Sequence, residues 1–127
     1  MPKLRAVEAL FPEFRRNLGD LLAFAEEQDL DGFAGCFRKA IKCLSANDPF
    51  AEVYHKDLAP FGFLILPERQ LLAACQAAWV FGGMGSWNDM TFDGKEQVRY
   101  ERLSASLLAL LNEGICVSTN SAAVRGR

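Results

Sequence analysis

The chain contains 127 residues, a length typical of one domain. Half of the residues are hydrophobic, which excludes a wholly disordered chain and allows a core that needs no metal or disulfide. Lys and Arg number 14 against 16 Asp and Glu, so the net charge is −2. We therefore expect no nucleic-acid partner, because such proteins need an excess of basic residues to contact phosphates.

Two amphipathic helices are predicted in the first part of the chain. The first spans residues 12–27, preceded by a short helical lead over 4–10, and the second spans residues 30–45. The apolar positions of the first helix recur at helical spacing: Phe11, Phe14, Leu18, Leu21, Leu22 and Ala25. We expect Asp29 or Asp31 to cap the start of the second helix.

The middle of the chain is less regular. A turn is predicted at residues 47–49, a short helix at 50–56, and an extended apolar segment at 63–66. A third helix is predicted over residues 67–81, apolar on nearly all sides and therefore buried. Gly82 and Gly83 are expected to end it, since glycine readily adopts the positive φ of a helix C-terminus.

The fourth predicted helix spans residues 95–117, with Thr91 or Asp93 as its cap. Residues 118–127 show no apolar period and are expected to fray. The sequence thus predicts an all-α fold, a single helical domain over residues 1–117 with a C-terminal tail. Its architecture is a bundle of four main helices plus short helical or irregular segments.

The four cysteines and one histidine do not form a metal site. No Cys-x-x-Cys pair occurs, and His55 alone cannot complete a zinc set. We expect reduced cysteines in the core and no cofactor. The N-terminus lacks the apolar stretch of a signal peptide, and no apolar run is long enough to cross a membrane. We therefore expect a soluble cytoplasmic protein without a membrane partner.

The segment 82–89 is the most distinctive in the chain, because it places three glycines in four positions before a tryptophan. One interpretation is a tight corner between helices, built by Gly82, Gly83 and Gly85, with the ring of Trp87 as its plug. The other is a binding surface. In that case Trp87 would be the anchor if it is exposed, and Asn88, Asp89 and Asp93 would supply polar contacts.

Segment 82–89 does not match the known phosphate-binding, dinucleotide-binding, nucleophile or calcium-binding motifs, because each requires a residue that the chain lacks. A phosphate-binding loop needs a lysine, and none follows Gly85. The dinucleotide-binding pattern and the nucleophile elbow both need glycine at position 88, where the chain has Asn88. A calcium loop that begins at Asp89 would need a carboxylate where Tyr100 stands.

The run Gly-Gly-Met-Gly-Ser-Trp-Asn-Asp over residues 82–89 resembles a shared element in a family of small bacterial helical proteins of unknown function. That element reads Gly-Gly-Met-Gly-Ser, an aromatic residue, then Asn-Asp, and the resemblance covers residues 71–120. It implies a cytoplasmic bacterial protein, one of the immunity proteins that neutralise a toxin used in competition between cells. No catalytic residues come with it.

The sequence is compatible with three functions. The first is a non-enzymatic protein that binds a partner, such as a cognate toxin, by direct contact. The second is an enzyme or small-molecule-binding domain with a pocket between helices, although His55 with Glu52 or Asp57 has no nucleophile nearby in the sequence. The third is a homo-oligomeric structural protein that covers an apolar helix face with its own copy.

Overall fold

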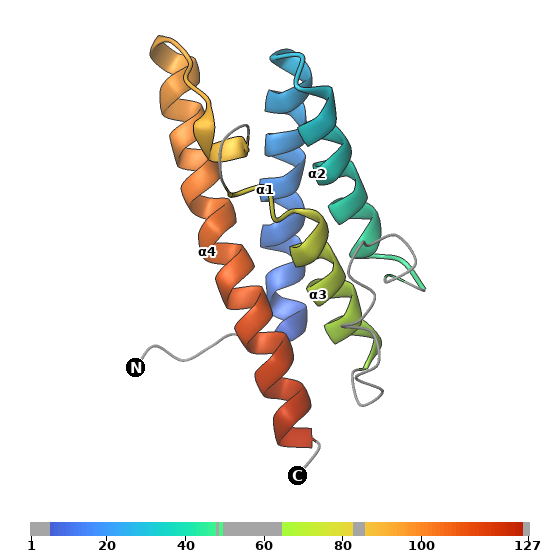
Figure 1. Ribbon diagram of the computed structural model, residues 1–127. Helices are drawn as coiled ribbons and strands as arrows, with labels where there is room; N and C mark the ends of the chain where they lie inside the picture. The colour runs from blue at the N-terminus through green and yellow to red at the C-terminus, as the bar shows by residue number, and fades with distance from the viewer. Residues whose placement is uncertain (1–5, 48, 50–64, 83–85, 126–127) are drawn as a thin grey trace.

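The computed structural model describes residues 6–47, 49, 65–82 and 86–125 (Figure 1). Its elements are α1 (Val7–Glu27), α2 (Asp31–Cys43), α3 (Leu66–Ala77), the short 3₁₀ helix η3 (Trp87–Asp89) and α4 (Gly94–Arg125). Within these residues there is no strand. The predicted all-α bundle of four main helices is confirmed. The predicted helix over 50–56 lies outside the described residues, as do His55 and residues 63 and 64.

The four helices run alternately up and down, so that helices adjacent in sequence are antiparallel (Figure 1). α1 packs against α2 and α4, and α3 packs against the same two helices. Each helix therefore has two main neighbours and presents its remaining surface outward. No helix in the described part of the chain is long and apolar enough to span a membrane.

α1 begins at Val7, upstream of the expected start, so that Pro12 lies inside the helix rather than in its first turn. A proline inside a helix removes one backbone hydrogen bond. Val7 and Leu10 are both buried in the core and extend the apolar stripe of Phe14 and Leu18 by one turn. The burial of these two side chains offsets the cost of the proline.

The connection between α1 and α2 is closed by the backbone, not by an aspartate cap as expected. Leu30 occupies the N-cap position of α2, and its side chain makes no capping hydrogen bond. Asp29 adopts the left-handed conformation with φ of 58°. That turn lets the Leu30 N–H donate to the Ala25 carbonyl at 2.8 Å. The prediction that Asp29 or Asp31 caps this helix is therefore wrong.

α3 ends at Ala77, earlier than the predicted stop at Gly82 and Gly83. The Ala78 N–H still donates to the Ala74 carbonyl, at 2.9 Å, and the chain then leaves the helical path. Residues 79–82 follow in a non-helical conformation. The glycines therefore do not end this helix. The early exit carries Trp79 away from the core, and 46% of its surface is exposed.

α4 continues to Arg125, beyond the expected end at Val117. The expected fraying from residue 118 is not seen, because Ser118 is fully buried and the helix is unbroken there. The hydroxyl of Thr119 also donates to the Ile115 carbonyl at 2.9 Å. In Figure 1 the C-terminal part of α4 runs past the level at which α1 begins.

α4 packs closely against α3 at Gly114. A Cβ atom at this position would lie 2.8 Å from Cys75 Sγ and 3.5 Å from Leu71 Cδ1. The first distance is shorter than a real carbon–sulfur contact allows, so the glycine is required by packing.

We expect Gly114→Ala to lower the free energy of unfolding by about 1–3 kcal/mol, because the new methyl group overpacks the α3–α4 contact. Gly35→Ala on α2 is the matched control, since a Cβ atom there meets nothing within 4 Å. It should raise stability by about 0.5–1 kcal/mol through helix propensity. Urea titrations followed by circular dichroism measure both. A stabilised Gly114→Ala chain would contradict the close packing.

Candidate functional site

The corner between α3 and α4 (residues 78–93) contains the sequence-predicted site, and Trp87 is at its centre. The Trp87 side chain is fully buried. Its ring meets those of Phe37 and Phe33 edge-on, with centroids 5.1 and 5.3 Å away, and the ring of Tyr100 at 5.4 Å. Such edge-on pairs are favoured by the ring quadrupoles. The indole therefore fastens the corner to α1, α2 and α4, since Phe24 of α1 also contacts it.

Every polar group of Trp87 has a protein partner. The indole Nε1–H donates to Ser104 Oγ at 2.8 Å, and the backbone N–H donates to the Val80 carbonyl at 3.0 Å. The Trp87 carbonyl accepts a hydrogen bond from the Tyr100 hydroxyl at 2.5 Å. Because the indole is buried and its N–H is already hydrogen-bonded, it has no free polar group or exposed surface with which to bind a partner. The expectation that Trp87 plugs the corner describes its place in the structure, whereas an anchor needs an exposed ring.

Asn88 closes the turn that precedes Trp87. Its Oδ1 accepts hydrogen bonds from the Gly82 N–H at 2.9 Å and from the Ser86 hydroxyl at 2.6 Å. Asn88 itself is exposed. Its amide oxygen thus holds the turn while the side chain faces solvent, which is the usual role of asparagine in turns. Gly83 and Gly85, the other two expected corner glycines, lie outside the described residues.

Asp93 is exposed immediately before α4, and its backbone carbonyl accepts the Glu96 N–H at 3.1 Å. Gly94 follows with φ of 54°, a conformation that favours glycine. Asp89 lies in η3, but its side chain is outside the described part of the structure. The corner therefore brings Asn88 and Asp93 to the surface at different points, Asn88 beside Gly82 and Asp93 at the start of α4.

Trp79 is the residue that sequence reasoning missed. The sequence placed it in the third helix, predicted over residues 67–81 to be buried on nearly all sides, whereas its ring is nearly half exposed. The ring of Phe81 meets it edge-on with centroids 6.3 Å apart. Phe81 directly precedes Gly82, which is bonded to Asn88, so this aromatic pair lies beside the Asn88 turn. Trp79 is exposed because α3 ends at Ala77, and predicting its exposure would have required predicting that helix end.

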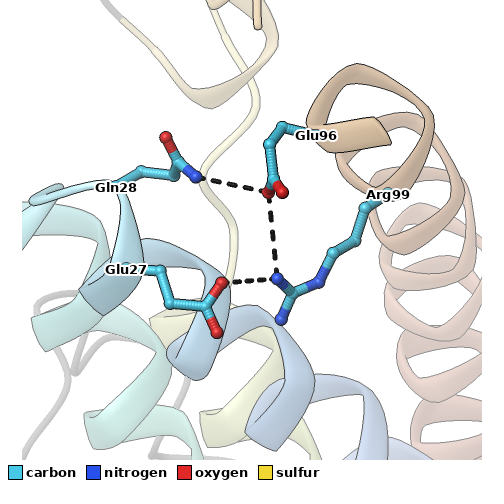
Figure 2. A network of polar contacts seen from close by, with 4 residues as sticks. All are labelled: Glu27, Gln28, Glu96 and Arg99. Carbon is cyan, nitrogen blue, oxygen red and sulfur yellow. Dashed lines mark hydrogen bonds and ion pairs between the residues drawn. The ribbon is translucent and has the colours of Figure 1, made fainter. Parts of the chain in front are cut away.

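A polar network joins the end of α1 to the start of α4 (Figure 2). Arg99 Nη1 lies 2.5 Å from Glu27 Oε2 and 3.8 Å from Glu96 Oε2, and Gln28 Nε2 donates to Glu96 Oε2 at 3.3 Å. The hydrogen bond to Glu27 raises the pKa of Arg99, so the guanidinium stays charged. The same guanidinium lies 5.3 Å from the ring centroid of Phe24. The network is thus attached by a cation–π contact to the ring of Phe24, which in turn contacts Trp87.

A shallow groove of about 190 Å³ runs between α1 and α4. Asn17 lies in its wall with Nδ2 donating to the Leu103 carbonyl at 3.3 Å, and the walls also carry Arg16, Asp20 and Arg102. Asn17 Oδ1 is buried and has no partner among the described residues. In the described part of the chain, no group of three or more His, Cys, Asp or Glu residues could hold a metal ion.

The chain was compared with protein-family models, curated proteins and solved structures, and none of them matches it. The resemblance of residues 82–89 to a family of small bacterial helical proteins thus stays a prediction.

The two tryptophans provide a direct test of the corner. Trp87→Ala should lower the free energy of unfolding by about 3–5 kcal/mol, because a fully buried aromatic side chain is removed. Trp79→Ala, the matched control, should change it by less than about 1 kcal/mol, since that ring is nearly half exposed. Trp87→Phe should fall between them, because it keeps an aromatic ring but leaves Ser104 Oγ without the indole donor. Equal losses at the two tryptophans would disprove the assignment of Trp87 as the plug.

The cysteines should differ in reactivity. Burial raises the pKa of the Cys75 thiol from its ordinary value of 9.0 to about 12, whereas Cys36 is only half-buried. We expect iodoacetamide at pH 8 to modify Cys36 well before Cys75, as read by peptide mass spectrometry. Because the unfolded thiol ionises near pH 9.0 and the folded one near 12, this group also lowers stability as pH rises through that interval. Rapid labelling of Cys75 in the folded chain would contradict its burial.

Proposed function

We propose that this chain is a non-enzymatic protein-binding protein, of the immunity type, that neutralises a cognate toxin in the bacterial cytoplasm by direct contact. The observation that carries the binding role is the exposed ring of Trp79, which meets the half-buried ring of Phe81 edge-on beside the Asn88 turn, on a corner fastened by buried Trp87. The toxin and the bacterial origin are supported by the resemblance of residues 82–89 alone.

The physical argument for binding starts from Trp79. The contact of a large aromatic ring with water is unfavourable, and 46% of the surface of Trp79 is exposed. Burying this ring against a partner would therefore contribute favourably to the free energy of binding. Tryptophan is also enriched among the residues that dominate binding energy at interfaces. The exposed ring of Trp79 therefore replaces Trp87 as the anchor of the proposed surface.

The corner supports this anchor by holding it in place. Hydrogen bonds from Trp87 to Val80 and from Gly82 to Asn88 fix the chain on the C-terminal side of Trp79. A surface that is ordered before binding loses less conformational entropy when the partner arrives. Asn88 Nδ2 and the carboxylate of Asp93 supply polar groups for the rim of such an interface.

Affinity capture of the tagged chain from its native lysate, with mass spectrometry of the eluate, identifies the partner. The captured protein is then expressed alone to measure its toxicity, and its binding is measured by calorimetry. We expect Trp79→Ala to weaken binding by about 30-fold or more, the effect of losing a hot-spot residue. Ile65→Ala, which truncates a side chain of similar exposure at the start of α3, is the control and should bind normally.

Three results would overturn parts of the proposal. If no second protein is captured, direct neutralisation fails. A captured partner that is harmless when expressed alone would remove the immunity role but keep the binding role. Unchanged affinity of Trp79→Ala for the captured partner would remove the aromatic pair from the interface.

A further inference from the structure

The groove between α1 and α4 carries charged side chains that the bundle itself does not use. Arg16 and Asp20 of α1 and Arg102 of α4 line it, and all three are exposed. Among the described residues none of the three forms an ion pair or a hydrogen bond. Arg99 attracts Asp20 from further along α4 but is already paired with Glu27. Charges of both signs are therefore available to a ligand in the groove.

Asn17 lies in the same groove and has one hydrogen-bonding atom without a partner. Its side chain is only 7% exposed, and its Nδ2 donates to the Leu103 carbonyl at 3.3 Å. The amide oxygen Oδ1 is buried and accepts no hydrogen bond from the described residues. A buried acceptor without a donor is unfavourable, whereas a hydrogen bond from a charged donor is among the strongest in proteins. Oδ1 therefore suits an ammonium group.

The groove has a charged end and an apolar end. Because α1 and α4 are antiparallel, Asp20 and Arg102 lie toward one end and Leu110 toward the other. Leu103 and Leu110 are two turns apart on α4 and give the groove an apolar floor. Glu13 also lines the end near Leu110, but its side chain already interacts with another group. A ligand with a charged head and an aliphatic side chain matches this polarity.

We propose that this groove binds a free α-amino acid with an aliphatic side chain. Its carboxylate lies between the guanidinium groups of Arg16 and Arg102, and its ammonium group donates to Asn17 Oδ1 and to the Asp20 carboxylate. Its side chain extends toward Leu110. Both arginine side chains are exposed and have many rotamers, so their rotation admits the ligand to the buried oxygen.

The chemistry of the groove selects a free amino acid over a segment of a protein partner. A free amino acid carries a carboxylate and an ammonium group on one carbon atom, whereas an internal peptide segment has neither. The volume of about 190 Å³ also limits the ligand to a small molecule. This inference does not rest on the proposed function, which uses the α3–α4 corner.

The first test is a titration of the isotope-labelled full chain with leucine, followed by amide NMR spectra at constant ionic strength. We expect saturable shifts at residues 16–20 and 102–106, with a dissociation constant of about 1 mM or below. Isocaproate, which lacks the ammonium group, and isopentylamine, which lacks the carboxylate, should each bind about tenfold more weakly or worse. Absence of shifts with leucine would overturn the proposal. Equal binding of either analogue would show attraction to a single charge and overturn it too.

The second test separates the two charged contacts. Arg102→Gln should weaken leucine binding by about tenfold or more, because the carboxylate loses one of its two cations. Asp20→Asn should weaken the binding of leucine but not that of isocaproate, which has no ammonium group. Arg38→Gln removes an exposed arginine of α2 outside the groove and is the control, with unchanged binding expected. Normal leucine binding by Arg102→Gln, or equal losses for leucine and isocaproate in Asp20→Asn, would contradict the proposed orientation.

Discussion

The contacts of Trp87 determine how the two halves of the bundle meet. One side chain touches Phe24 of α1, Phe33 and Phe37 of α2, and Tyr100 of α4. α1 and α2 form a hairpin closed by a short turn, whereas α3 and α4 are joined by the much longer corner. Without a fixed point in that corner, the position of α4 against the hairpin would depend on helix packing alone. The buried indole supplies the fixed point, and its hydrogen bonds give it one orientation.

The close contact at Gly114 fixes α4 a second time, against α3, some distance along the helix from Trp87. Asn17 adds a third attachment, from α1 to the Leu103 carbonyl, beside the residues of α4 that contact Trp87. A long helix held at three places behaves as a rigid element. A surface attached to such an ordered element loses less entropy when it binds.

The sequence predicted the helices well where one apolar stripe faces one core. Phe14, Leu18, Leu21 and Ala25 of the predicted stripe on α1 are fully buried, and Phe11 and Leu22 are partly buried against the core. It predicted the end of α3 poorly, because residues 71–81 are apolar on nearly all sides and contain no local signal for a break at Ala77. The exit depends on a distant event, the docking of Trp87 and its hydrogen bond to the Val80 carbonyl. Local propensity does not contain that information, so the exposure of Trp79 could not be predicted.

The same reasoning separates the two tryptophans by role. The sequence placed the functional interest at Trp87 because glycines and asparagine surround it, and these residues do build the turn. In the structure, however, the whole surface of Trp87 is buried in contacts within the chain, so none of it remains for a partner. The exposed ring of Trp79 is a consequence of that organisation, since the chain must leave α3 early for residue 87 to reach the core. A change at Trp87 would therefore also displace Trp79, and loss of binding in such a variant would not by itself place Trp87 in an interface.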